Sequence, residues 1–218
     1  MSMHRVRTLV ALVLASASAA PASAQGTSVL PIADAKARVA VEREIARAQA
    51  KGLPTQPLIA KAMEGVTKQA TGERIRVAVA SQAKRLEQAR ALLAPSQSVA
   101  ELTSGADALA VGVPAPMLKQ LRAAWPVDRS VAMPLDVLTE LVARGIPAKH
   151  ALEQITALMK RGATPSQIAS LGTSVQADVA AGLAPDAALE VRARGVMSLL
   201  PSPAAAASLA PTGSRPPR

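Results

Sequence analysis

The chain has 218 residues, a formal net charge of +10 and 50% hydrophobic residues, with one tryptophan and no cysteine, phenylalanine or tyrosine. This length suffices for one ordinary domain with a buried core. Because aromatic side chains are nearly absent, that core must be aliphatic. The lack of cysteine excludes disulfides and thiol chemistry.

Residues 1–24 have the features of a secretory signal peptide. A short basic stretch precedes an apolar run, and Ala22-Ser23-Ala24 forms a small-residue cleavage site before Gln25. The apolar run is shorter than the roughly 20 residues that a transmembrane helix needs. We therefore expect cleavage between Ala24 and Gln25, a periplasmic or secreted mature protein, and no transmembrane anchor.

The remainder divides into a short leader, one folded domain and a tail. Residues 25–33 are the leader, and residues 34–200 are expected to form a single all-α domain. Residues 201–218 are rich in proline and alanine, which cannot bury a core, and this composition predicts a disordered tail.

Amphipathic helices are predicted throughout the domain. Over 147–160, apolar residues fall on one side of a helical projection and charged residues on the other, and similar stripes run through 73–93, 134–144 and 165–181. No alternating strand pattern or hairpin turn signal accompanies them. The fold class is therefore predicted to be all-α.

Five motifs place a proline two or three residues after a glycine. Glycine takes the left-handed conformation that ends a helix, and proline suits the first turn of the next helix. Each motif predicts a tight corner between helices, with the intervening apolar residue packed beneath it. The corner residues are Gly52 and Pro54, Gly112 and Pro114, Gly145 and Pro147, Gly162 and Pro165, and Gly182 and Pro185.

The chain also carries an internal duplication. A shift of 93 residues aligns the unit 35–93 with the unit 134–186, and 98–125 resembles a partial copy. Repeated helical hairpins are typical of a helical array, which presents an extended binding face. A compact, irregular bundle whose corners share good capping chemistry is the alternative.

Positive charge is concentrated in the first unit. Residues 37–95 hold 11 Lys or Arg against 5 Asp or Glu, whereas residues 96–200 hold 9 of each. The first unit is therefore a candidate anion-binding surface, with a solvated, arginine-rich face as the alternative. Its candidate residues are Arg43, Arg47, Lys51, Lys61, Lys68, Arg74, Arg76, Lys84, Arg85 and Arg90.

Few residues suit catalysis, metal or cofactor binding. After signal cleavage His150 is the single histidine, and we expect it on a solvent-exposed helix face. Ser81 and Lys84 match an S-x-x-K pattern by chance, because Ser81 is predicted in mid-helix and the other elements of that enzyme class are absent. We predict no metal site and no cofactor.

Carboxylate pairs and aromatic stacking are the remaining chemical routes. Glu101 with Asp107, or Asp136 with Glu140, would supply two carboxylates, but a sugar cleft also needs rings. Trp125 is predicted to pack in the core, and without stacking residues or a recognition motif we predict no nucleic-acid binding.

These observations predict a non-catalytic exported helical protein that binds an unknown protein partner or has a structural role in the periplasm or cell envelope. The alternative is a binder of anionic envelope components through the basic first unit. Lipid headgroups, lipopolysaccharide phosphates and acidic polymers are such components.

Overall fold

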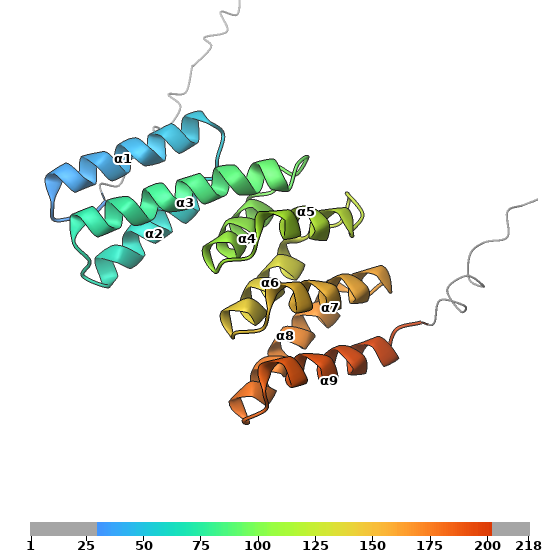
Figure 1. The fold of residues 1–218 in the computed structure, drawn as a ribbon. Coiled ribbons are helices and arrows are strands. Elements are labelled where there is room, and N and C mark those ends of the chain that lie inside the picture. Colours follow the sequence, from blue (N-terminus) through green and yellow to red (C-terminus); the bar gives the residue numbers. More distant parts are fainter. Residues whose placement is uncertain (1–29, 202–218) are drawn as a thin grey trace, which may run out of the picture.

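A computed structural model describes residues 30–201, and over this range the chain folds into nine helices without a strand (Figure 1). The all-α prediction is confirmed. The predicted signal peptide, residues 25–29 of the leader and the tail beyond residue 201 lie outside the described residues. The helices are α1 Ala35–Ala50, α2 Gln56–Thr67, α3 Gly72–Leu92, α4 Val99–Ala110, α5 Ala115–Ala123, α6 Ala132–Ala143, α7 Ala148–Lys160, α8 Pro165–Ala180 and α9 Pro185–Ser198.

The helices form a stack of hairpins with a three-helix group at its N-terminal end. In the stack, α4, α6 and α8 pack in one row, and α5, α7 and α9 pack in a second row (Figure 1). The long helix α3 contacts α4 and α5, while α1 and α2 both pack on α3. Each hairpin thus contacts its sequence neighbours.

The corners owe their shape to glycines with positive φ. At Gly145, where φ is 90°, the glycine N–H donates to Val142 O and the Ile146 N–H donates to Leu141 O. This pair of bonds is the Schellman motif, in which a left-handed residue satisfies the last carbonyls of a helix. Positive φ also occurs at Gly52, Gly112, Gly162 and Gly182.

The apolar residue of the corner is buried in four of the five motifs. Leu53, Val113, Ile146 and Ala163 are buried, whereas Leu183 is 43% exposed. Leu183 lies between α8 and α9, the last hairpin of the described chain, so no following hairpin in that range covers it.

In the three short motifs, the proline lies at a different position relative to the start of the helix than predicted. Pro165 and Pro185 occupy the first position of α8 and α9, as predicted. Pro114 and Pro147 are instead the N-cap residues of α5 and α7, and Pro54 lies just before the N-cap of α2. The short motif has one residue fewer between glycine and proline, so the proline falls before the first helical position. The φ of −60° at Pro114 and −55° at Pro147 is the value that the proline ring fixes.

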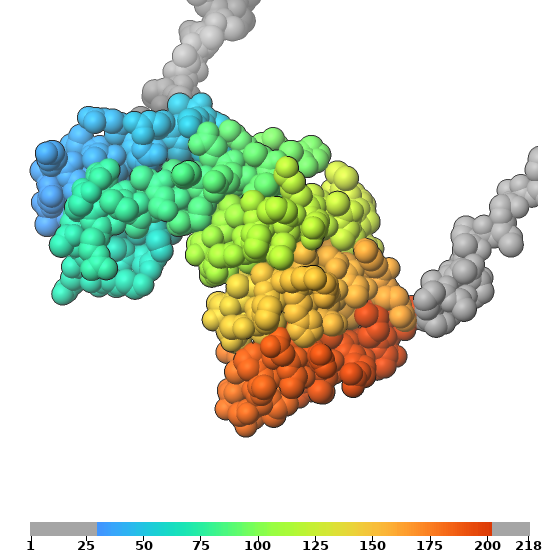
Figure 2. Space-filling view, viewed as in Figure 1, coloured from blue at the N-terminus to red at the C-terminus, as the bar shows by residue number. Residues whose placement is uncertain are grey.

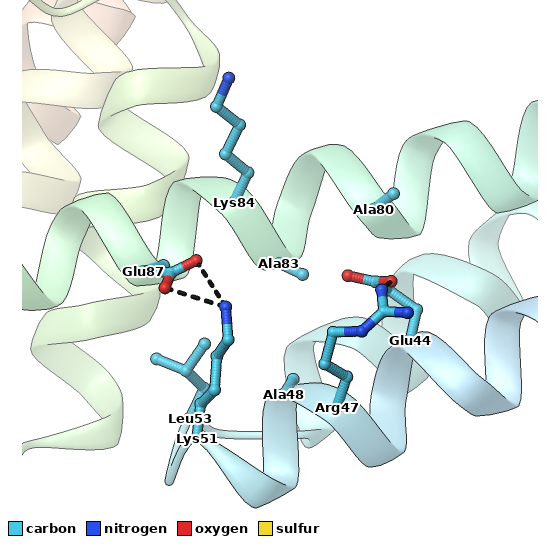
Figure 3. Close-up of a pocket in the computed structure, with 9 residues that line it drawn as sticks. All are labelled: Glu44, Arg47, Ala48, Lys51, Leu53, Ala80, Ala83, Lys84 and Glu87. Carbon is cyan, nitrogen blue, oxygen red and sulfur yellow. Dashed lines mark hydrogen bonds and ion pairs between the residues drawn. The ribbon is translucent and has the colours of Figure 1, made fainter.

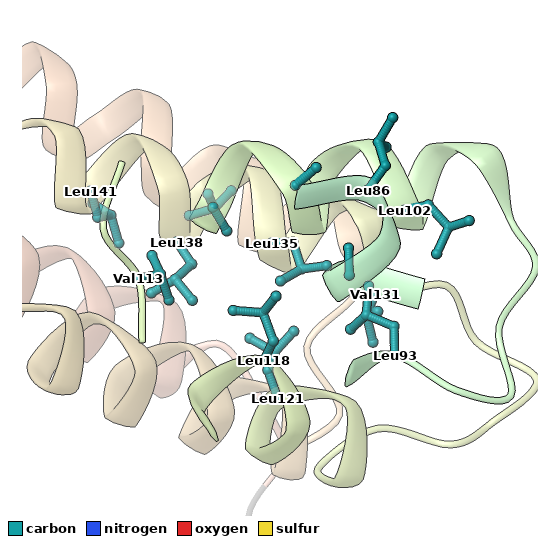
Figure 4. Packing of buried hydrophobic residues seen from close by; sticks show 14 of the residues in the cluster. Leu86, Leu93, Leu102, Val113, Leu118, Leu121, Val131, Leu135, Leu138 and Leu141 are labelled. Atoms are coloured by element: carbon teal, nitrogen blue, oxygen red, sulfur yellow. The ribbon is translucent and has the colours of Figure 1, made fainter. Parts of the chain in front are cut away.

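The core is aliphatic and continuous along the stack. Leucines of α3 to α6 interdigitate in its middle, where they are fully buried (Figure 4). Among them are Leu86, Leu102, Leu118 and Leu138. Leu30 and Ile32 are also buried, so packing begins a few residues before the predicted domain start at residue 34.

The two units of the sequence repeat share an order of elements but pack differently. The shift of 93 residues places α2 on α7 and α3 on α8. However, α2 packs extensively on α3, whereas α7 packs on α5, α6 and α9 and has little contact with α8. The second unit differs because α9 takes the place beside α7.

Candidate anion-binding groove

The ten cations predicted as one surface are divided by α3 into separate groups. Lys61, Lys68 and Arg74 line a groove between α2 and α3, and Arg47, Lys51 and Lys84 line a smaller pocket between α1 and α3. Arg43, Arg76, Arg85 and Arg90 line neither of them. Six of the ten candidate cations thus line two separate cavities, and a single anion-binding surface made of all ten stays a prediction.

The α2–α3 groove is the larger of these two cavities, with a volume of about 360 Å³. Gly65 lets the helices approach closely, because a Cβ at this position would lie 2.7 Å from Ile75 Cγ1. The turn from Gln69 to Thr71 closes one end. The lining residues are Lys61, Glu64, Gly65, Lys68, Gln69, Ala70, Thr71, Arg74, Ile75 and Ala78.

Glu64 bridges the two lysines of this groove. Lys61 Nζ lies 2.8 Å from Glu64 Oε2, and Lys68 Nζ lies 2.5 Å from Glu64 Oε1. Hydrogen bonds from Lys61 and then Lys68 lower the pKa of Glu64 to about 2. At neutral pH Glu64 is therefore ionised and neutralises one of the two lysine charges.

Arg74 provides the third cation of the groove. Its side chain is exposed, and within residues 30–201 it forms no ion pair or side-chain hydrogen bond. The lining of the α2–α3 groove thus holds three cations and one carboxylate, and it keeps a net positive charge.

The pocket between α1 and α3 is smaller, at about 80 Å³, and its lining holds three cations and two carboxylates (Figure 3). Lys51 Nζ pairs with Glu87 at 3.0 Å, and Arg47 pairs with Glu44. Lys84 points away from the other lining side chains in Figure 3. This pocket therefore offers an anion less unpaired charge than the α2–α3 groove.

Two of the remaining cations, Arg76 and Arg90, make contacts although they line neither of these two cavities. Arg76 forms a two-pronged pair with Glu73, whose pKa is lowered by the hydrogen bonds from Arg76. Arg90 Nη1 donates to the Lys51 carbonyl at 2.5 Å and so ties α3 to the end of α1. Glu73 neutralises the charge of Arg76, whereas Arg90 keeps its charge and uses one guanidinium nitrogen to bind a backbone carbonyl.

One side of the molecule is hollowed between α2 and α4 (Figure 2). Gly65 of α2 packs at Ile75, and Gly105 of α4 packs at Ala89. Ile75 and Ala89 lie about four helical turns apart and therefore on the same side of α3. Both α2 and α4 thus pack against that side. The floor of the hollow is therefore the middle of α3.

A polar network connects this floor to α4. Arg85 donates to Ser81 Oγ at 2.7 Å and to Gln82 Oε1 at 2.8 Å. Gln82 Nε2 then donates to Asp107 Oδ1 at 3.3 Å. Ser81 is thus in mid-helix, as predicted, and its hydroxyl accepts a hydrogen bond from a guanidinium.

His150 departs from its predicted exposure. Its side chain is 24% exposed, and its Nδ1 lies 3.0 Å from Asp186 Oδ1 at the start of α9. The helical projection placed His150 on the polar face correctly, but α9 packs beside α7 and partly covers that face. His150 therefore bridges two helices.

Glu101 and Asp107, one of the two carboxylate pairs considered from the sequence, have different partners in the fold. Glu101 is buried and accepts a hydrogen bond from Val131 N at 3.0 Å, while Asp107 faces α3. Asp107 instead lies near Asp136, whose pKa is raised mainly by burial and further by the Asp107 charge. No sequence spacing indicated this contact, because it joins α4 to α6.

A buried ion pair was also missed. Arg122 and Glu101 are 8% and 4% exposed, and Arg122 Nη1 lies 3.7 Å from Glu101 Oε2. Arg122 also donates to the carbonyls of Trp125, Pro126 and Arg129, which holds the loop between α5 and α6. Trp125 is buried in the core, as predicted.

Within residues 30–201, no helix combines the length and apolar character required to cross a membrane. No group of three or more His, Cys, Asp or Glu is arranged there to hold a metal ion. Comparison with protein-family models, curated proteins and solved structures found no match for this chain.

Proposed function

We propose that this chain is a non-catalytic binding protein of the cell envelope, which holds a protein partner on its stacked hairpins. The observation that carries this proposal is the hollow between α2 and α4, floored by α3 (Figure 2). Helical arrays commonly use such concave surfaces to bind proteins. The signal-peptide features of residues 1–24 support the envelope location.

Site-specific photocrosslinking in native cells tests the protein-binding proposal. A crosslinker at Asp107, which borders the hollow, should capture one partner, whereas a crosslinker at the exposed Val191 of α9 should not. The captured protein is then purified, and its affinity for the full chain is measured. No saturable binding between the two purified proteins would contradict the proposal.

The location has its own test. The mature protein is recovered from the envelope fraction, and the mass of its N-terminal peptide is measured. Cleavage as proposed gives a chain that starts at Gln25. An intact N-terminus, or recovery only from the cytoplasm, would argue against export.

The second candidate function is binding of an anionic envelope component. The specific observation in its favour is the α2–α3 groove, which gathers three cations around one cavity. Binding to anionic vesicles that weakens steeply with added salt would support this function. Absence of such binding at low salt would remove it.

A further inference from the structure

We infer that the α2–α3 groove binds a phosphate group, and that Glu64 holds its two lysines in position until the phosphate displaces the Glu64 carboxylate. This inference rests on the second candidate function and names its site and its ligand chemistry. The groove is lined by Lys61, Lys68 and Arg74.

The number of acceptor atoms distinguishes phosphate from a carboxylate. Each oxygen of Glu64 accepts a hydrogen bond from one lysine, and no hydrogen bond or ion pair joins this carboxylate to Arg74 among the described residues. A phosphate group presents at least three acceptor oxygens and can bind two ammonium groups and the fork of Arg74 together. In size and charge, a phosphate group therefore fits the three cations of the groove better than the Glu64 carboxylate does.

Glu64 is able to leave these positions. The side chains of Glu64 and Lys68 are 41% and 69% exposed, so the carboxylate can turn into solvent without burying a charge. The low pKa of Glu64 shows that the two lysines already form a site for negative charge. A ligand with a larger charge competes for the same site.

Gln69 adds a hydrogen-bond donor to the groove. It adopts a positive φ of 52° in the corner that ends α2, and it lines the groove. Its amide N–H₂ can donate to a phosphate oxygen. The groove floor includes Ile75 and Ala78, which offer an apolar wall to the ester group of a phosphoester.

The experiment compares two triple variants of the full chain. In the first, Lys61, Lys68 and Arg74 are changed to alanine; in the matched control, Arg47, Lys51 and Lys84 are changed to alanine. Each variant loses three exposed or half-exposed cations from one cavity, so long-range attraction falls equally. Thermal unfolding checks that both variants fold.

Two probes separate the possible sources of phosphate. Vesicles of phosphatidylglycerol in phosphatidylcholine present a lipid phosphate, and glycerol phosphate presents a soluble one. At low salt, the groove variant should lose vesicle affinity by about a hundredfold, and the control by less than about fivefold. Binding to glycerol phosphate with the same ranking would identify a soluble phosphoester as a ligand.

Equal losses in the two variants would overturn the groove as the site but leave anion binding intact. No binding of the unchanged protein to either probe would overturn both the inference and the second candidate function. Glu64→Gln provides an independent readout, because it removes the competing charge and should raise affinity by about fivefold. Glu87→Gln, in the Lys51 pair, is its control and should leave affinity unchanged.

Discussion

Gln69 and Gly162 occupy the same position in two helix-ending corners that lie 93 residues apart. Gln69 has a φ of 52° and Gly162 has a φ of 86°. In each corner, this residue and the next donate to two carbonyls of the preceding helical turn. The first corner therefore has the same left-handed geometry as the second, but with a side chain at the left-handed position.

Gln69→Gly should stabilise the fold. A left-handed conformation costs a residue with a Cβ about 1 kcal/mol, and glycine avoids this cost. The free energy of unfolding should rise by about 1 kcal/mol, and the melting temperature by roughly 2–4 °C for a domain of this size. Thermal and denaturant unfolding measure both quantities.

The reciprocal change, Gly162→Gln, is the control and should lower stability by a similar amount. A Cβ at Gly162 would meet nothing within 4 Å, so the loss would come from the backbone alone. Unchanged midpoints in both variants would contradict the corner geometry.

Local sequence signals predicted the helices and the glycine corners because both arise from neighbouring residues. Amphipathic periodicity and left-handed caps do not depend on distant contacts. Gln69 escaped prediction since a glutamine carries no such signal. Its role shows only when Gly162 is aligned with it.

The candidate groove depends on contacts between residues far apart in the sequence, which local sequence patterns do not reveal. The Lys51–Glu87 pair joins the C-cap residue of α1 to α3, and the Glu101–Arg122 pair joins α4 to α5. A charge count treats all cations of the first unit alike, whereas the fold neutralises some and leaves Arg74 without an ion pair among the described residues. The sequence therefore indicated a basic region but not its groove.

Gly105→Ala should destabilise the contact between α3 and α4. A Cβ at Gly105 would lie 2.8 Å from Leu93 Cδ1 and 3.1 Å from Ala89 Cβ, so the helices would have to separate. Overpacking of this kind costs about 1–3 kcal/mol. The helix preference of alanine returns roughly 1 kcal/mol, so we expect a net loss of up to about 2 kcal/mol in the free energy of unfolding. Denaturant unfolding measures this loss.

Gly195→Ala is the matched control in α9. A Cβ there would meet no atom within 4 Å, and alanine favours a helix over glycine by roughly 1 kcal/mol. This variant should therefore be more stable than the parent. If both alanine variants were equally stabilising, the close approach at Gly105 would be wrong.

In the Arg122→Met variant, the loop between α5 and α6 should unfold more easily and the domain should be less stable. It leaves the Glu101 carboxylate buried without its cation and removes the donor to three loop carbonyls. Breaking a buried pair on one side costs about 3–5 kcal/mol. Hydrogen exchange of the Val131 amide, which bonds to Glu101, reports the loop directly.

Arg144→Met is the comparison, because Arg144 pairs with Glu140 one turn away on the surface. Loss of such a pair should cost no more than about 0.5 kcal/mol. Similar losses for the two arginine variants would show that the Glu101–Arg122 pair is not a buried determinant of the fold.

Asp136→Asn should stabilise the protein at neutral pH and not in acid. Burial, with a further contribution from the Asp107 charge, raises the pKa of Asp136, so the folded state keeps its proton to higher pH than the unfolded state. Wild-type stability therefore falls as the pH rises from the unfolded pKa, about 3.9, through the raised folded pKa. Asparagine cannot ionise and avoids this loss, which should be below about 1 kcal/mol because the carboxyl is partly solvated.

Unfolding curves at about pH 3 and pH 7 test the ionisation of Asp136, since both states are mostly protonated at the lower value. Asp107→Asn, which keeps an oxygen for Gln82, should also stabilise at pH 7 by removing the charge that disfavours ionised Asp136. The double variant should gain less than the sum of the two, because each change removes the same repulsion. An equal gain at both pH values would point to packing instead of charge, and strict additivity would show that the two carboxylates do not interact.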